Sequence, residues 1–263
     1  MSALAAVVIV AALMAIAMAA LWLVQRRLLE ADVVDLGWTA GLGLAAVFYA
    51  WVLPDGVAWR RWLVAAMAGI WAARLASYLL LTRVLRGGED GRYVDLRAKW
   101  GDRSQQKFFV FFQAQGVLVA LLSIHFILAM QAPDPGLRLL DALGVTLWIT
   151  SIVGESLADR QLSRFRADPA NRGQVCREGL WRYSRHPNYF FEWVHWLAYV
   201  PLAFGSVPFL ATLAAPAVML LAILFFTGIP PIEERSVRSR GDAYREYQRT
   251  TSAFFPWPPR RGA

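Results

Sequence analysis

Long apolar runs, separated by short polar connections, cover most of the chain. Seven of these runs are predicted to be membrane-spanning helices, because about 20 apolar residues span the hydrocarbon core of a bilayer. They occupy residues 3–25, 33–54, 62–81, 108–131, 139–157, 189–204 and 207–229. Helices are expected because backbone groups in lipid must be hydrogen-bonded within their own segment. The pattern predicts an all-α, multi-pass membrane protein with a single membrane domain over residues 1–263, ending in a polar tail over residues 230–263.

The overall composition and the start of the chain agree with this prediction. Hydrophobic residues make up 57% of the chain and charged residues 17%. No Lys or Arg precedes Arg26, and the first run is longer than the apolar part of a secretory signal. We therefore expect this run to be a retained anchor. Cys176 is the only cysteine in the sequence, so no disulfide framework is expected.

Basic residues are concentrated in alternate connections between the predicted helices. The rich connections carry Arg26 and Arg27, the basic residues of 83–107 and 160–185, and those of the tail. The connections between them carry few, namely Arg60, Arg61 and Arg138. Positively charged loops stay in the cytoplasm, so we predict an outside N-terminus and a cytoplasmic C-terminus in a bacterial inner membrane or its equivalent. Topology thus accounts for the net charge of +8, and no nucleic-acid partner is expected.

Several ionisable or polar side chains lie inside the predicted helices or at their ends. They are Asp35 on the second helix, Arg74 and Tyr78 on the third, Glu155 and Asp159 on the fifth, and Glu192 and His195 on the sixth. A charge at the centre of a membrane helix costs about 2.5–3.5 kcal/mol, so such residues usually mark a function. By the predicted topology, all except His195 lie in the cytoplasmic half or at its edge. The pattern predicts a binding site at that level.

Structural roles compete with functional ones at some of these positions. Asp35 could equally cap the second helix, and Arg74 could pair with an acid on a neighbouring helix. His125 is expected to be a hydrogen-bonded core residue. The three histidines are well separated and the sequence holds one cysteine, so no metal site is expected.

The segment YSRHPNYFFE, residues 183–192, lies among arginines and aromatic residues. The arginines are Arg164, Arg166, Arg172, Arg177, Arg182 and Arg185, with amides at Asn171 and Asn188. Guanidinium groups suit phosphate oxygens, Tyr183 and Tyr189 offer flat faces to a ring system, and Asp159 or Glu192 can accept from sugar hydroxyls. This inventory matches a dinucleotide with a phosphorylated ribose. The glycines of GLGLAA, residues 41–46, lie inside a predicted membrane helix with no preceding strand, so they are not a dinucleotide fingerprint.

The segments ESLADRQLSRFRAD (155–168) and GLWRYSRHPNYFFEW (179–193) resemble the DUF1295 family, which belongs with the steroid 5-alpha-reductase C-terminal domain. The third-helix segment RLASYLLLTR (74–83) and the loop RGGEDGRY (86–93) resemble another motif of the same family. The resemblance covers most of the chain, roughly from Asp35 to the tail. It implies a seven-helix membrane enzyme that takes NADPH from the cytoplasm and reduces the double bond of a 3-oxo-4-ene steroid.

The resemblance also implies roles for particular residues. Asp159, Arg166, Tyr183, Asn188 and Glu192 fall on positions that resemble the family's cofactor contacts, and Arg74 and Tyr78 match on the third helix. The predicted cofactor site also includes neighbouring residues that the resemblance does not assign, namely Arg164, Arg177, Arg185, His186 and Tyr189. The Glu and Tyr with which steroid reductases bind the substrate carbonyl fall near Asp35 and on Trp71, and Tyr78 completes the predicted catalytic set. Because Trp71 has no phenolic hydroxyl, we expect a lipophilic enone entering from the bilayer rather than a steroid in particular.

Two other functions stay open on the sequence. The RHP segment with Glu233, Glu234, Tyr244 and Tyr247 is similar to isoprenylcysteine carboxyl and phospholipid methyltransferases, whose cofactor is S-adenosylmethionine. A non-catalytic lipid-binding protein would instead pair its buried polar residues with one another and leave no cavity. The arginines favour the reductase, because a methyl donor carries no phosphate. The sequence does not indicate an oligomeric state.

Overall fold

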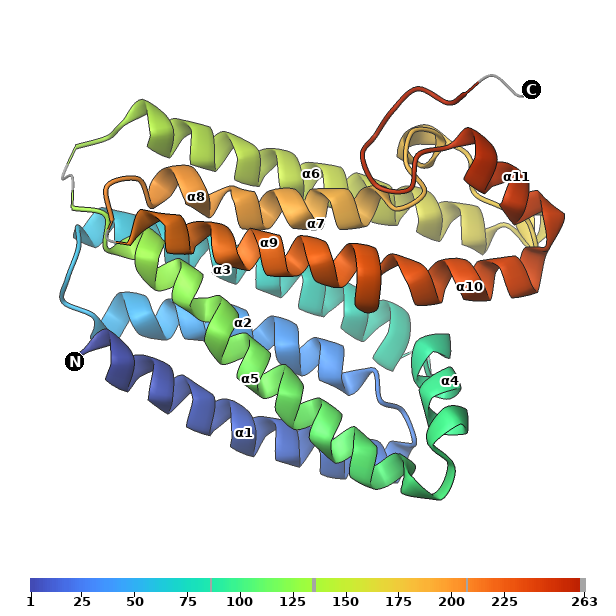
Figure 1. The fold of residues 1–263 in the computed structure, drawn as a ribbon, viewed down its shortest axis with the longest axis horizontal. Coiled ribbons are helices and arrows are strands. Elements are labelled where there is room, and N and C mark those ends of the chain that lie inside the picture. Colours follow the sequence, from blue (N-terminus) through green and yellow to red (C-terminus); the bar gives the residue numbers. More distant parts are fainter. Residues whose placement is uncertain (86, 134–135, 207, 261–263) are drawn as a thin grey trace. The chain divides into compact units, whose positions relative to one another are not determined.

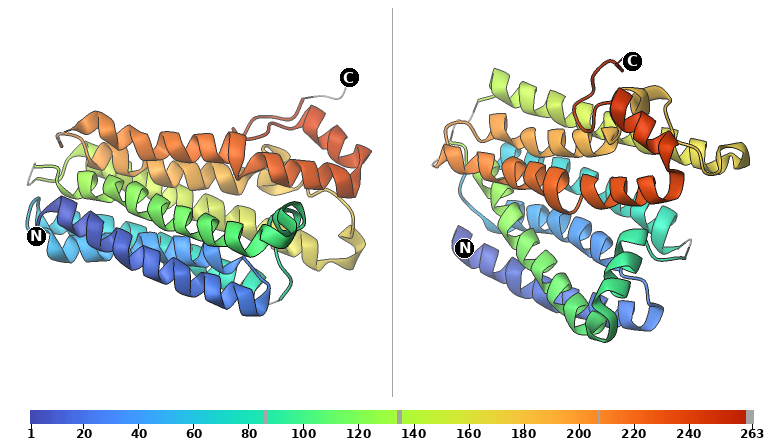
Figure 2. Two further views of the ribbon diagram at one scale, coloured as in Figure 1. Left: turned by 60° about the horizontal axis from the view of Figure 1, so that its bottom comes forward. Right: turned by 45° about the vertical axis from the view of Figure 1, so that its right-hand side comes forward.

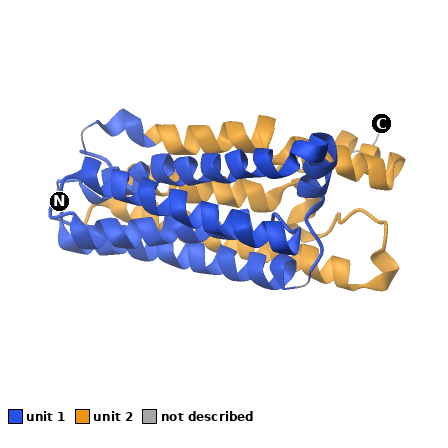
Figure 3. Ribbon diagram, turned by 90° about the horizontal axis from the view of Figure 1, so that it is seen from below, with its two compact units in different colours: residues 1–136, 202–212 blue, residues 137–201, 213–263 orange. Residues whose placement is uncertain are grey.

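The computed structural model describes residues 1–85, 87–133, 136–206 and 208–260, and these residues form helices and loops without strands. Arg86, at the start of the RGGEDGRY loop, and Val207, at the start of the seventh predicted helix, lie outside the described residues. The chain divides into two compact units (Figure 3). Unit 1 comprises Met1–Gly136 and Leu202–Thr212, and unit 2 comprises Leu137–Pro201 and Leu213–Ala263. The single membrane domain stays a prediction.

Among its described residues, unit 1 is built from four long helices and one short one. They are α1 (Ala3–Leu28), α2 (Val33–Val52), α3 (Ala58–Leu79), α4 (Gly91–Trp100) and α5 (Ser104–Met130). Helix α1 packs against α5 and α2, and α2 packs against α3 and α5 (Figures 1 and 2). Gly43 allows the close approach of α2 and α3, because a Cβ there would lie 2.5 Å from the Cβ of Ala72.

The polar connection after α3 is mostly helical. Helix α3 continues as the π-helix η1 (Leu80–Val84), and the 3-10 helix η2 (Gly101–Arg103) joins α4 to α5. Asp90 caps α4, because its side chain accepts a hydrogen bond from the Arg92 backbone N–H at 2.9 Å. The predicted cytoplasmic loop is therefore an ordered polar layer at one end of unit 1.

The described part of unit 2 contains two long helical segments and a folded segment that follows them. Its elements are α6 (Leu139–Ala167), η3 (Pro169–Asn171), η4 (Gly179–Arg182), α7 (Pro187–Leu197), α9 (Ala214–Leu221), η6 (Ala222–Phe226), α10 (Ile229–Arg240) and α11 (Asp242–Thr250). The short α8 (Tyr199–Leu202) and η5 (Phe209–Leu213) each end where the chain passes from one unit to the other. Helix α6 packs along α7, and a Cβ at Gly154 would lie 2.4 Å from the Phe191 ring.

Six helical segments are long and apolar enough to cross a membrane among the described residues. They are Ala3–Leu28, Val33–Val52, Ala58–Val84, Gly91–Met130, Leu139–Ala167 and Phe209–Arg240. These helices are those of a multi-pass membrane protein. The run at 189–204 instead forms α7, of 11 residues, and α8, of four. The count of seven and the orientation of the termini stay predictions.

Helix α6 is longer than the sequence indicates. Its apolar run was predicted to end at residue 157, but the helix continues to Ala167. The added turns are polar and carry Asp159, Arg164 and Arg166. Hydropathy does not detect this extension, because a helix that leaves the apolar layer keeps its backbone hydrogen bonds while its side chains become polar. Three predicted cofactor residues consequently share one rigid helix.

Candidate functional site

The candidate site in unit 2 begins where the η4 turn docks on α6. The Leu180 backbone N–H donates to the Gln161 side-chain oxygen at 2.9 Å. The Trp181 indole N–H donates to the Ala158 carbonyl at 2.9 Å. Gly179 has a φ of +55°, and a Cβ there would clash with the Gln161 side chain. These contacts fix the start of the YSRHPNY segment against the polar end of α6.

The next residues form a tight turn that leads into α7. Ser184 accepts a hydrogen bond from the His186 backbone N–H at 3.1 Å and donates to the Phe254 carbonyl at 2.8 Å. Pro187 occupies the first turn of α7, where its missing N–H costs no helical hydrogen bond. The turn therefore holds Arg185 and His186 in place from both sides.

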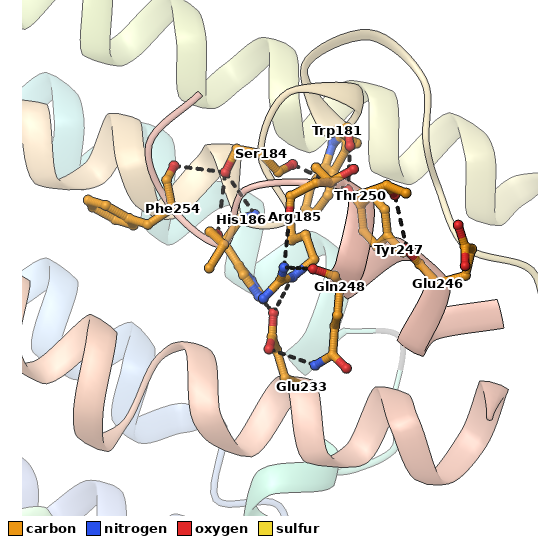
Figure 4. Close-up of polar contacts among 12 residues, drawn as sticks. Trp181, Ser184, Arg185, His186, Glu233, Glu246, Tyr247, Gln248, Thr250 and Phe254 are labelled. Carbon is orange, nitrogen blue, oxygen red and sulfur yellow. Dashed lines mark hydrogen bonds and ion pairs between the residues drawn. The ribbon is translucent and has the colours of Figure 1, made fainter. Parts of the chain in front are cut away.

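Arg185 and His186 both bind Glu233 of α10 (Figure 4). The Arg185 Nε and His186 Nε2 atoms lie 2.6 Å and 3.2 Å from the same Glu233 oxygen. The other Glu233 oxygen accepts from the Gln248 side chain at 2.9 Å. Arg185 also donates to the backbone carbonyls of Gln248 and Thr251, at 3.0 Å and 2.6 Å. We call these four side chains, of Arg185, His186, Glu233 and Gln248, the tail latch.

The ionisation of His186 follows from its surroundings. Burial lowers the pKa of His186, and the opposing attraction of Glu233 does not cancel this effect. The ring is therefore neutral at pH 7. Because a carboxylate only accepts hydrogen bonds, Nε2 carries the hydrogen that is donated to Glu233. The Tyr189 ring stacks on the other side, with centroids 5.6 Å apart and planes 11° from parallel.

The C-terminal tail is fastened over the same turn by backbone contacts (Figure 4). The Tyr247 hydroxyl donates to the carbonyls of Trp181 and Ser184. The Arg185 N–H donates to the Ser252 carbonyl at 2.8 Å, and the Trp257 N–H donates to the Tyr183 carbonyl at 2.9 Å. Burial raises the pKa of Tyr247 and keeps its hydroxyl a donor. We call residues 242–259 the tail strap.

The remaining predicted cofactor residues have varied surroundings. Arg177 donates to the Ala243 carbonyl at 2.7 Å and lies over the Tyr247 ring, so it also fastens the strap. Tyr183 is exposed and Asn188 is partly buried. Glu192 is buried and accepts from the Trp196 indole at 3.1 Å. Asp159 is buried on α6. The tail latch and tail strap therefore hold three of the predicted cofactor residues, Arg177, Arg185 and His186.

Four exposed arginines border this region without a side-chain partner among the described residues. They are Arg160, Arg164, Arg172 and Arg182, which we call the open arginines. Arg160 and Arg164 lie one turn apart on α6, and Arg166 is exposed on the same helix. An open depression of about 680 Å³ is lined by Asp242, Arg245, Gln248 and Arg249 on α11. This end of unit 2 presents mainly positive charge.

The predicted catalytic residues belong to unit 1, as does Arg74. Asp35 accepts hydrogen bonds from Arg83 at 3.1 Å, Arg92 at 2.9 Å and the Tyr93 hydroxyl at 2.7 Å. Arg83 and Arg92 also pair with Asp90, at 3.4 Å and 3.2 Å. Asp35 therefore anchors the connection between α3 and α5. It does not cap α2, whose N-cap residue is Asp32 and which has no side-chain hydrogen bond at its cap.

The other residues of the predicted catalytic set lie on α3. Trp71 is fully buried, with its ring edge-on to Trp38 at a centroid distance of 6.0 Å. The Arg74 guanidinium lies 5.7 Å from the centre of the Tyr78 ring, as the four-residue spacing indicates. The Tyr78 hydroxyl has no hydrogen-bond partner among the described residues and is partly buried. Arg74 and Tyr78 thus form one pair within unit 1.

Sequence reasoning missed several partners in both units. It did not connect Glu233 with Arg185, or Asp35 with Arg92, because these residues are 48 and 57 positions apart in the chain. The Glu233–Glu234 pair was recognised only as a feature of methyltransferases. Gln248 carried no recognisable pattern. Pairing each buried or half-buried acid with a basic residue would have been the available guide to these contacts.

The chain is similar to other proteins along most of its length. The model of the family described as "Protein of unknown function (DUF1295)" matches residues 21–251. The "Uncharacterized protein C594.04c" of Schizosaccharomyces pombe is 27% identical over 263 residues, which covers 90% of this chain and 75% of the yeast protein. No solved structure matches. Since the family model spans most of the sequence, including the turn, the latch and the Asp35 cluster, the chain belongs to the DUF1295 family.

Proposed function

We propose that this protein is an NADPH-dependent reductase of a carbon–carbon double bond in a lipophilic enone. The observation that carries the proposal is the unbalanced positive charge at the polar end of unit 2. Acids there are engaged by arginines, in the pairs Glu233–Arg185, Asp242–Arg245 and Glu246–Arg249. Two exposed acids near the four open arginines lack a side-chain partner among the described residues, namely Glu178 and Asp168, which accepts only from the Ala170 backbone N–H.

This charge distinguishes between the two cofactors that the sequence leaves open. NADPH carries a pyrophosphate and a 2′-phosphate, which guanidinium groups bind well. S-adenosylmethionine carries a sulfonium cation and no phosphate, so a basic surface repels its reactive group. Glu233 does not offset that repulsion, since Arg185 already neutralises it. The balance of charge therefore supports the reductase over the methyltransferase.

The residues present fit the phosphate groups of NADPH better than its ring. Arg164, Arg166 and Arg182 would hold the phosphates, and Asp159 would accept from ribose hydroxyls. NADPH would supply the hydride that adds to the β-carbon of the enone. The tail latch and strap would keep the turn from Tyr183 to Asn188 in a fixed shape beneath the cofactor, which limits the entropy lost on binding.

Within unit 1, Tyr78 fits the role of a donor to the substrate carbonyl better than Asp35 does. Negative charge develops on that oxygen as hydride arrives, and a preorganised donor stabilises it. The Tyr78 hydroxyl is available, whereas the Asp35 oxygens already accept from Arg83, Arg92 and Tyr93. We therefore assign the donor role to Tyr78 and a positioning role to Asp35.

Thermal unfolding of the detergent-purified protein tests the cofactor directly. NADPH at about 100 times its Kd should stabilise the protein by about 2.7 kcal/mol and raise its unfolding temperature, while S-adenosylmethionine should leave that temperature unchanged. Stabilisation by S-adenosylmethionine alone would establish the methyltransferase. No response to either cofactor would favour the non-catalytic lipid-binding protein.

A further inference from the structure

A cluster of basic residues lies where the end of α1 meets the start of α5 in unit 1. The two helices run antiparallel, since the Gln113 amide donates to the Ala15 carbonyl and the Trp22 indole N–H donates to the Gln105 carbonyl. The Gln25 and Gln105 side chains join at 2.7 Å. Arg26, Arg27, Arg103 and Lys107 each lie within two residues of that bond. We call these four residues the basic patch.

The positive charge of the basic patch is not neutralised within the described residues. Arg27 and Arg103 are exposed and have no side-chain partner there. The Arg26 guanidinium lies 4.9 Å from the Trp22 ring centre, and the Lys107 ammonium 5.9 Å from that of Trp100. A ring orients a cation without removing its charge.

The charged residues that neighbour the basic patch differ in whether a partner neutralises them. Arg97 on α4 contacts Glu89 in an ion pair of 2.5 Å, so its charge is compensated. Lys99, also on α4, is exposed and lies one helical turn after Asp95. Asp102, inside η2, is the exposed acid next to Arg103. The four cations of the patch therefore outnumber two nearby carboxylates, those of Asp102 and of Glu30, which accepts from the Gly88 N–H.

An apolar surface continues from the basic patch along the same two helices. On α1, Leu23 and Val24 are 53% and 40% exposed, and on α5, Phe109 and Val110 are 39% and 66% exposed. Trp22 is partly buried between the charged and apolar parts, where indole rings sit at a membrane interface. The surface is positive at one level and apolar beside it.

We propose that the basic patch is a binding site for an anionic phospholipid. Its phosphate would accept hydrogen bonds from Arg26, Arg27 and Arg103, with Lys107 supplying further charge. Its acyl chains would lie along the exposed apolar surfaces of α1 and α5. The charge complements a phosphate, and the adjoining apolar surface distinguishes a lipid from a soluble anion, which would need no such surface.

Native mass spectrometry of the full chain with added phosphatidylglycerol tests the proposal, with phosphatidylcholine of the same acyl chains as the reference lipid. The wild type should retain phosphatidylglycerol in preference. Each cation near an anionic lipid strengthens binding about fivefold, so Arg26→Gln/Arg27→Gln/Arg103→Gln/Lys107→Gln should lose that preference. Its unfolding temperature in phosphatidylcholine should match that of the wild type.

The matched control removes the four open arginines of unit 2 by Arg160→Gln/Arg164→Gln/Arg172→Gln/Arg182→Gln. This variant loses the same charge and should keep the preference. Equal losses in both variants would mean that net charge alone attracts the lipid, which would overturn the site. If the first variant fails to fold, the wild type provides the test. Salt near 1 M screens charges beyond about 3 Å, so it should abolish the preference of the wild type for phosphatidylglycerol. An undiminished preference at that salt would also overturn the site.

Discussion

Asp35 illustrates how one side chain can be polar, membrane-proximal and still structural. Its two carboxylate oxygens receive hydrogen bonds from two arginines and a tyrosine, all of which follow α3 in the chain. These donors are drawn from η1 and α4, so Asp35 joins three elements at one point. A carboxylate in this position orders the polar layer of unit 1.

We predict that Asp35→Asn destabilises the protein by about 2 kcal/mol, because hydrogen bonds to charged groups contribute about 1.5–3 kcal/mol and Asp35 is partly shielded from water. Thermal unfolding in one detergent measures the effect, with NADPH affinity expected to remain as in the wild type. Asp102→Asn is the control, since that exposed acid has no side-chain partner among the described residues. An unchanged unfolding temperature for Asp35→Asn would show that the cluster does not stabilise unit 1.

Tyr78 invites the opposite experiment, because its hydroxyl has no partner to lose. Tyr78→Phe keeps the ring beside Arg74 and removes only the hydrogen-bond donor. If that hydroxyl stabilises the developing charge on the substrate oxygen, turnover should fall about 100- to 1,000-fold. The unfolding temperature and the NADPH affinity should stay at wild-type values. Wild-type turnover of a lipophilic enone by this variant would exclude Tyr78 from the chemistry.

At the scale of elements, the tail strap depends on a short list of side chains. Helix α9 passes through the π-helix η6 to Gly228, where a Cβ would lie 2.6 Å from the Ile223 carbonyl oxygen. Two prolines follow within the first turn of α10, which then delivers Glu233 to the latch. Phe254, within the strap, packs with Ile223 and Ile229. The direction of α10 and the position of the strap are therefore set together.

We predict that Glu233→Gln loosens the strap, because it removes the charge that Arg185 and His186 share. Hydrogen exchange of the backbone amides in residues 242–259 should accelerate by at least tenfold, which corresponds to a loss of about 1.4 kcal/mol.

The neighbouring Glu234→Gln is a matched control for this prediction. The Glu234 side chain is 72% exposed, and its contact with Arg238 spans 4.0 Å at the surface, so its removal should change exchange very little. Comparable acceleration in both variants would mean that the latch does not hold the strap.

At the scale of the whole chain, hydropathy predicted most of the long helices, because every residue of an apolar run contributes to the signal of a membrane helix. The four-residue spacing of Arg74 and Tyr78 predicted that they share one helix face, because helical spacing depends only on the local sequence. The sequence pattern did not predict the strap, because Arg185 is held by backbone carbonyls of Gln248 and Thr251. Every residue has a carbonyl, so no residue type marks such an acceptor. Contacts of this kind arise from the path of the chain, which the pattern of one sequence does not contain.

The uneven charge of the chain leads to a final prediction about cofactor choice. Arg164 and Arg166 lie at the exposed end of α6, and NADPH differs from NADH by one phosphate on its ribose. If these arginines bind that phosphate, Arg164→Gln/Arg166→Gln should weaken NADPH about tenfold, or about 1.4 kcal/mol, and NADH far less. Fluorescence titration of both nucleotides measures the difference, with Arg238→Gln as the control because that arginine pairs with Glu234. Equal losses of affinity for the two nucleotides would mean that these α6 arginines bind only the phosphates that NADPH and NADH have in common.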